Sequence, residues 1–221
     1  MNKKALIAEF IATFAFTFIG VGAIAANYIS GGASGLVGIA LAHGLTIAVM
    51  VAAIGAYSGA HINPAVTIGL WSTKNIDNKN ALGYIAAQLL GAVVAAALIK
   101  MAMPLDVLKA VGMGTPAIGE GISLGMAFVT EVILTFLLVF VIYGVAVDKR
   151  GMAPAGLWIG VTVTLGILMG GPVSGAAMNP ARYFGPALLG GGLQHCWLYF
   201  LAPVTGGILG ATVYKNYLSG K

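Results

Sequence analysis

Charge is the scarcest property of this 221-residue chain. It contains 11 Lys and Arg and 6 Asp and Glu, so only 8% of the residues are charged, while 59% are hydrophobic. A soluble globular domain is charged at about a quarter of its positions. The composition therefore excludes a soluble domain and predicts an integral membrane protein.

Cysteine and catalytic motifs are also scarce. Cys196 is the only cysteine, which excludes a disulfide within the chain and provides no spacing for a metal site. The sequence has no phosphate-binding loop, Rossmann glycine pattern, nucleophile elbow or paired-histidine metal motif. We therefore expect no catalytic residue, no bound metal and no cofactor, and a membrane enzyme is disfavoured.

Six apolar runs are long enough to cross a bilayer, and two shorter ones are not. The long runs lie near residues 5–27, 36–57, 81–103, 122–147, 153–171 and 197–214. The first run begins like a signal peptide, but Glu9 interrupts it and its length allows it to span, so we retain it as a span. The short pieces, 63–72 and 179–189, would form helices about 15 Å long, half the hydrocarbon thickness. They are predicted to meet at the midplane from opposite sides.

Both short pieces begin with Asn-Pro-Ala inside a longer shared pattern. Residues 58–65 read Ser-Gly-Ala-His-Ile-Asn-Pro-Ala, and residues 174–181 read Ser-Gly-Ala-Ala-Met-Asn-Pro-Ala. Each half of the chain holds three full spans, an odd number, so the second half must enter the membrane from the opposite side. The predicted fold is an all-α integral membrane domain over 1–221, with six transmembrane helices and two re-entrant half-helices.

The two halves are predicted to form an inverted repeat. The repeats cover about 1–103 and 122–221, and loop 104–121 joins them. The solute site of such a repeat is expected at the midplane, between the halves. Loop 104–121 could fold over the outer mouth, but nothing in its sequence specifies a function.

Most basic residues fall on one side when six spans are threaded through a membrane. They are Lys3, Lys4, Lys74, Lys79, Lys149, Arg150, Lys215 and Lys221. Because an excess of Lys and Arg marks the cytoplasmic side, both termini are expected in the cytoplasm, with the chain in the cell (plasma) membrane. This placement accounts for the net charge of +5 without a nucleic-acid partner.

Asn63 and Asn179 are predicted to cap the half-helices. Each precedes a proline, which is preorganised for the first helical position. Their side-chain oxygens should accept from the backbone N–H groups of Val66 and Arg182, which leaves the amide NH2 groups as donors toward a lumen. The stretches before each asparagine are expected to be extended and to offer a ladder of carbonyl acceptors. The alternative is that both residues are caps only, with no solute nearby.

Predicted membrane segments contain the charged residues Arg182, Glu9 and Glu131 away from their ends or at the midplane, where charge is expensive. Arg182 directly follows the second motif and is predicted to serve function rather than to snorkel to an interface. Glu9 and Glu131 could be proton-relay carboxylates of a coupled transporter, or they could accept from the backbone of the re-entrant loops. Their equivalent positions in the two halves favour the second role.

Together these features resemble the aquaporin (major intrinsic protein) family over nearly the whole chain. The residues that carry the resemblance are Asn63, Pro64, Ala65, Asn179, Pro180, Ala181, Glu9, Glu131 and Arg182. The resemblance implies a right-handed bundle of six helices with two half-helices. It also implies a homotetramer with one pore per subunit.

The resemblance further implies a four-residue selectivity filter on the extracellular side of the asparagines. Counted from the matching motifs, its members are His43, Ile167, Ala176 and Arg182. This set is similar to the plant vacuolar branch, which passes water and often ammonia or urea. Tyr183 stands where the glycerol branch has Asp, which is a departure from that branch.

We therefore expect a passive channel for water that also admits small neutral solutes such as ammonia, with glycerol or urea slower, and that excludes protons and ions. Its expected partners are these solutes and the lipid bilayer. Two alternatives stay open: a glycerol or small-solute facilitator, and an ion-coupled secondary transporter. His61 is expected to be partly structural and partly vestibule-lining, and Cys196 is expected to lie outside the constriction.

Overall fold

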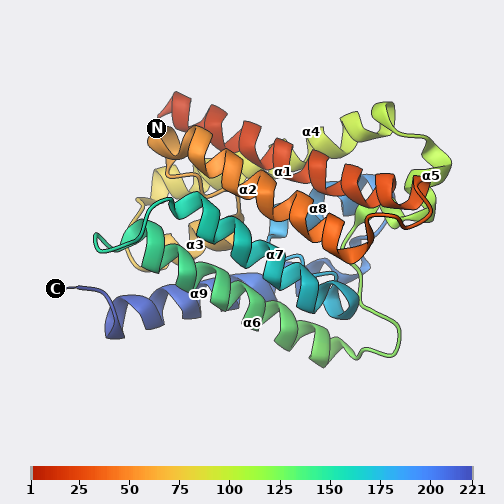
Figure 1. Cartoon of the computed structure of the whole chain (residues 1–221). Coiled ribbons are helices and arrows are strands. Elements are labelled where there is room, and N and C mark those ends of the chain that lie inside the picture. The colour runs from red at the N-terminus through yellow and green to blue at the C-terminus, as the bar shows by residue number, and fades with distance from the viewer. Residues whose placement is uncertain (1, 221) are drawn as a thin grey trace.

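The computed structural model describes residues 2–220, which form a bundle of helices (Figure 1). The α-helices are α1 (Lys3–Ile29), α2 (Gly35–Ser58), α3 (Pro64–Ser72), α4 (Asn78–Ala102), α5 (Leu105–Ala110), α6 (Leu124–Ile142), α7 (Ala155–Ser174), α8 (Pro180–Gly190) and α9 (Cys196–Tyr217). Short turns of other helix types cover Gly112–Gly114, Tyr143–Val147 and Leu193–His195. Within the described residues, six helices are long and apolar enough to cross a membrane. The predicted six spans and two half-helices are confirmed.

The predicted helix ends fall within a few residues of the observed ones, and the largest differences have local causes. The span predicted to end at 171 continues to Ser174, although Pro172 lies inside its last turn. It ends where Gly175 adopts a left-handed conformation, with φ of 79°, and its N–H bonds back to the Gly171 carbonyl. Glycine tolerates this conformation without strain, so it ends the helix more firmly than the proline does.

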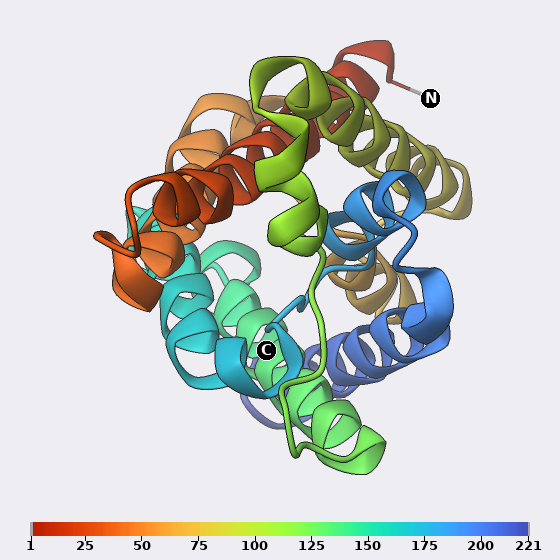
Figure 2. The same cartoon turned by 90° about the vertical axis from the view of Figure 1, so that its right-hand side faces the viewer.

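The two half-helices enter the bundle from opposite ends. In Figure 1, α3 lies toward the end that holds both chain ends, and α8 lies toward the other end. Loop 104–121 lies at the end with α8, and it contains α5 and a helical turn that composition did not predict. Figure 2 shows this segment crossing over the middle of the bundle.

Each half packs two of its own helices together through a glycine at the matching position. A side chain on Gly91 of α4 would place its Cβ 2.4 Å from the Phe10 carbonyl oxygen of α1. A side chain on Gly206 of α9 would place its Cβ 2.2 Å from the Val132 carbonyl oxygen of α6. Only glycine permits such close approach of two helix backbones, a packing mode common in membranes. The correspondence supports the predicted inverted repeat.

Large apolar side chains cover the outside of the bundle. Ile7, Val49 and Leu165 are 59%, 63% and 60% exposed. A soluble monomer rarely exposes a continuous apolar surface of this kind, whereas a lipid-facing surface requires one. Polar side chains such as Glu9 and Glu131 are instead buried inside the bundle.

Candidate functional site

Glu9 of α1 holds the first re-entrant loop from inside the bundle. Its buried carboxylate accepts from the Ser58 hydroxyl at 2.6 Å and from the backbone N–H groups of His61 and Ile62 at 2.9 and 2.7 Å. A buried backbone N–H without a partner is costly, and this loop has no helix of its own to provide one. The carboxylate therefore replaces the missing secondary structure.

Glu131 of α6 repeats this arrangement in the second half. It is buried and accepts from the Ser174 hydroxyl at 2.7 Å and from the N–H groups of Ala177 and Met178 at 2.8 and 2.7 Å. Each glutamate therefore bonds three matching donors of its own loop. This geometry supports the loop-supporting role over a proton relay.

The backbones of both re-entrant loops adopt left-handed conformations that the sequence did not predict. Ala60 and Ile62 have φ of 52° and 59°, and their counterparts Ala176 and Met178 have φ of 44° and 48°. The prediction of extended stretches is therefore wrong at these four positions. A non-glycine residue in this region costs about 1–2 kcal/mol, so the conformation must be imposed by surrounding contacts such as those to the glutamates.

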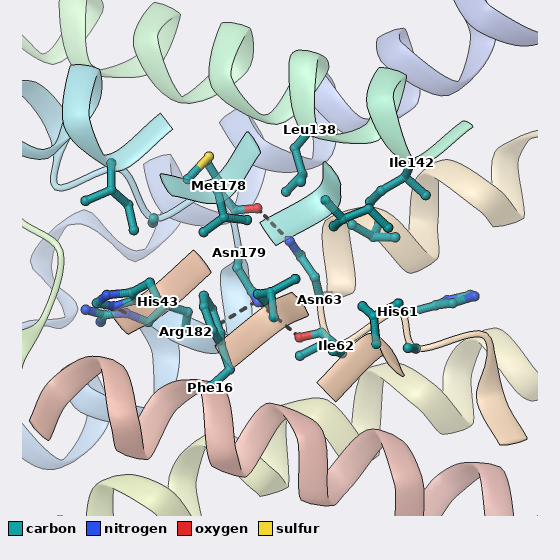
Figure 3. A pocket seen from close by; sticks show the side chains of 18 of the residues that line it. Phe16, His43, His61, Ile62, Asn63, Leu138, Ile142, Met178, Asn179 and Arg182 are labelled. Atoms are coloured by element: carbon teal, nitrogen blue, oxygen red, sulfur yellow. Dashed lines mark hydrogen bonds between the residues drawn. The ribbon is translucent and has the colours of Figure 1, made fainter. Parts of the chain in front are cut away.

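Asn63 and Asn179 cap α3 and α8 and also bind each other's loops. The Asn63 Oδ1 accepts from the Ala65 N–H at 2.8 Å, and its Nδ2 donates to the Met178 carbonyl at 2.7 Å. The Asn179 Nδ2 donates in turn to the Ile62 carbonyl at 3.0 Å (Figure 3). Since an amide nitrogen has two hydrogens, each asparagine retains one donor.

Two details of the predicted caps change. The Asn63 oxygen accepts from Ala65, so the expected bond from the Val66 N–H is wrong. The Asn179 oxygen accepts from Ala181 at 2.9 Å and, as predicted, from the Arg182 N–H at 3.3 Å. Both caps therefore satisfy the first free donors of their half-helices.

Two cavities run along the bundle and meet at the predicted filter. The inner cavity encloses about 30 Å³ and is lined by both asparagines and His61. The outer cavity encloses about 300 Å³ and is lined by residues of loop 104–121. The residues that line both cavities are His43, Ile167, Ala176 and Arg182. The structure thus places the four predicted filter residues around one junction.

His43 and Arg182 are joined at this junction. The Arg182 Nε donates to His43 Nε2 at 3.3 Å, and its Nη1 donates to the Gly114 carbonyl at 2.7 Å. His43 Nδ1 bonds the Ile39 carbonyl at 2.8 Å. Both side chains lie at one end of the inner cavity, with the asparagines between them and His61 (Figure 3). The contact of Arg182 with Gly114 was not predicted from the sequence, because every residue has a backbone carbonyl and the residue type does not reveal which one accepts.

Arg182 is a buried cation without a carboxylate partner. It is 4% exposed, and among residues 2–220 the only ion pair joins Arg150 to Asp148. The N-termini of α3 and α8 add positive partial charge near the middle of the cavity. The electrostatics therefore oppose cations along this path.

The described residues contain no group of three or more His, Cys, Asp or Glu side chains arranged to hold a metal ion. Six helices that are long and apolar enough to span a membrane surround two cavities that meet at one junction, the arrangement that a channel requires. Comparison with known proteins gives the same class.

The family model described as Major intrinsic protein matches residues 1–214. Similar proteins include the aquaporin NIP3-1 of Arabidopsis thaliana, which is 46% identical over 219 residues, 98% of this chain and 68% of that protein. The aquaporin TIP4-4 of Zea mays is 44% identical over 222 residues, 96% of this chain and 86% of that protein. A solved structure of the aquaglyceroporin from Plasmodium falciparum superposes with a TM-score of 0.85 at 29% identity, covering 98% and 97% of the two chains. The chain belongs to the major intrinsic protein, or aquaporin, family.

Proposed function

We propose that this channel conducts water passively, admits ammonia and similarly small neutral solutes, and passes glycerol or urea slowly. The observation that carries the proposal is the junction of the two cavities at His43, Ile167, Ala176 and Arg182. None of these four side chains carries a six-membered aromatic ring, so the opening is wider than a constriction that contains such a side chain. Arg182 still donates into the junction and repels cations, so the extra width favours neutral solutes over ions.

Proton exclusion is proposed to arise at the two asparagines. Each retains one amide hydrogen after donating to the other loop. A water molecule between them would accept from both and could not relay a proton along the pore. The positive ends of the two half-helices add a barrier to any cation.

A second candidate is a facilitator with glycerol as its main solute. The solved structure of an aquaglyceroporin favours this candidate because it covers almost the whole chain. Tyr183 argues against this candidate, because the glycerol branch of the family has Asp at the equivalent position. The two candidates differ only in the order of permeabilities.

We further propose a homotetramer in the plasma membrane with both termini in the cytoplasm. Both chain ends lie at the same end of the bundle (Figure 1). Four basic residues lie near the helix ends that the six-span topology places on the same side as the termini. They are Lys74, Lys149, Arg150 and Lys215. An excess of such residues marks the cytoplasmic side.

Stopped-flow light scattering on proteoliposomes tests the proposed function. We expect water to permeate fastest, then ammonia, then urea and glycerol. The rates for water, urea and glycerol, which do not ionise, should not change when a proton gradient is imposed. Ala176→Trp, which fills the filter, provides a matched protein with a closed pore. Glycerol flux comparable to that of water would favour the second candidate, and strict dependence on the gradient would indicate a coupled transporter.

A further inference from the structure

A buried polar network lies behind His61, at the end of the inner cavity away from the filter. His61 Nδ1 lies 3.0 Å from Thr67 Oγ1, and Gln88 Nε2 lies 3.0 Å from the same oxygen. Gln88 Nε2 also lies 2.8 Å from Glu9 Oε2. Thr67, Gln88 and Glu9 are completely buried. Each hydrogen in this network can therefore be placed by counting donors and acceptors.

The Gln88 amide has only one possible orientation. The Glu9 carboxylate already accepts from Ser58, His61 and Ile62, and an ionised carboxylate has no hydrogen to donate. The Gln88 atom beside it must therefore be the nitrogen. The two amide hydrogens are then used, one on Glu9 and one on Thr67.

The neighbouring acceptors direct the Thr67 hydrogen away from His61. The Asn63 carbonyl lies 3.1 Å and Gln88 Oε1 lies 3.5 Å from the hydroxyl, and both oxygens can only accept, so the hydrogen points to the nearer Asn63 carbonyl, whose oxygen would otherwise repel that of Thr67. The Thr67 oxygen is then an acceptor for both Gln88 and His61. His61 Nδ1 must therefore carry a hydrogen, and in neutral imidazole this leaves Nε2 with a free lone pair.

The His61 Nε2 atom is left without a partner inside the described protein. It has no hydrogen-bond partner among residues 2–220, and His61 lines the inner cavity. His43 differs in this respect, because its Nε2 already accepts from Arg182. His61 is therefore a free ring acceptor on a path whose other side-chain contacts, Asn63, Asn179 and Arg182, are donors.

The network is not needed to build a re-entrant loop. Tyr84 and Tyr199 donate to the equivalent carbonyls of Ser58 and Ser174, which aligns α4 with α9 and places Pro203 opposite Gln88. The motif alignment similarly places Ala177 opposite His61 and Tyr183 opposite Thr67. Glu131 thus supports the second loop without a counterpart of the network.

We propose that Thr67 and Gln88 are positioning residues that hold the hydrogen of His61 on Nδ1, so that Nε2 accepts a hydrogen bond from each passing solute. His61 then favours molecules with O–H or N–H groups at the inner end of the pore, and the donors at the asparagines and filter select for acceptors. Water, ammonia and small alcohols or amides have both a hydrogen-bond donor and an acceptor. This inference rests on the proposed function, because it adds a solute contact to the same pore.

Nitrogen-15 solid-state NMR of the protein in lipid vesicles tests the assignment without any flux measurement. The chain has three histidines, and loss of a signal in His61→Asn identifies that of His61. We expect a protonated Nδ1 and a bare Nε2 at neutral pH. Thr67→Val should give a mixture of both tautomers, whereas Thr67→Ser and the control Thr46→Val should retain the wild-type spectrum. A wild-type His61 with its hydrogen on Nε2 would overturn the proposal, whatever the channel conducts.

Permeability measurements test the consequence for transport. Folded His61→Leu should lose water and ammonia permeability by about two- to tenfold, the range for one hydrogen bond. Folded Thr67→Val should lose less, because its mixed tautomers keep part of the acceptor, and Thr67→Ser should restore the wild-type permeability. Unchanged permeability in Thr67→Val, with mixed tautomers seen by NMR, would show that the His61 acceptor does not act on solutes. If Thr67→Val does not fold, His61→Leu with intact folding provides the same flux comparison.

Discussion

The guanidinium of Arg182 donates from Nη1 to the backbone carbonyl of Gly114 at 2.7 Å. Gly114 belongs to the connection between α4 and α6, which crosses over the outer end of the bundle (Figure 2). This connection therefore lines the outer cavity, and its backbone helps to hold Arg182 of the proposed filter in place.

Gly114→Val should reduce water permeability by about tenfold, the effect of losing a hydrogen bond to a charged group. Gly114 has φ of 62°, and an added Cβ would lie 3.3 Å from Val21 of α1, so the backbone at Gly114 is strained and must shift, which disturbs its bond to Arg182. Gly112→Val is the matched control, because Gly112 has a similar φ of 55° but open space around it. Equal permeability of the two folded variants in stopped-flow assays would contradict this role of the loop.

Glu9→Gln and Glu131→Gln should reduce the yield of folded protein more than the permeability of each folded channel. Either orientation of the new amide places an NH2 group against a backbone N–H of the loop, which leaves a buried donor unsatisfied at a cost of about 1–3 kcal/mol. Size-exclusion chromatography in detergent measures the folded yield, and the exposed Glu120→Gln is the control. Well-folded variants with almost no water flux would instead place the carboxylates on the conduction path.

Much of the fold could be predicted because its main signals are local. Apolar length identifies the spans, and Asn63-Pro64 and Asn179-Pro180 mark the starts of the half-helices. The four residues of the proposed filter could be predicted to lie together because they were counted from these motifs, and all four line both cavities. The glutamates could be paired because the repeat places both at the same position.

The parts that could not be predicted depend on backbone geometry and on contacts distant in sequence. The left-handed conformations of Ala60 and Ala176 are imposed by the tertiary structure against the local preference of alanine. The Gly114 carbonyl and the α5 helix lie in a segment whose composition indicates only a loop. The partners of Gln88 could not be predicted either, although an uncharged polar residue inside an apolar run is a signal that a partner exists.

Mercuric ion should inhibit the wild-type channel weakly. Cys196 is the only cysteine, and it lines neither of the two cavities that meet at the filter. Ala176→Cys should create strong inhibition that a thiol reagent reverses, because residue 176 lines both cavities. Strong inhibition of the wild type that is lost in Cys196→Ser would show that Cys196 controls the path.

Asp148→Asn should release the C-terminal segment. The Asp148 side chain is 4% exposed and accepts from Arg150, which in turn donates to the Leu218 carbonyl at 2.6 Å. The side-chain and backbone hydrogen bonds from Arg150 hold the pKa of Asp148 well below its usual value. Since the lowered pKa belongs to the folded state, the contact is fully present above the usual pKa and is lost only on strong acidification.

Hydrogen exchange by mass spectrometry measures this release. In the wild type, exchange in residues 215–220 that is normalised for intrinsic rate should not change between about pH 5 and pH 8. Asp148→Asn should accelerate it, and Lys149→Gln, an exposed neighbour, should not. Equal exchange in both variants would show that the carboxylate does not hold the segment.

The permeability of His43→Phe relative to wild type tests most directly whether the junction at His43, Ile167, Ala176 and Arg182 selects solutes. Phenylalanine places a six-membered ring at the junction and removes the acceptor for Arg182 Nε. Liposome swelling should show ammonia, urea and glycerol fluxes reduced more than water flux, because water is the smallest permeant, and His195→Phe, outside both cavities, should change none of them. If His43→Phe leaves all three fluxes unchanged relative to water, His43 does not line the filter.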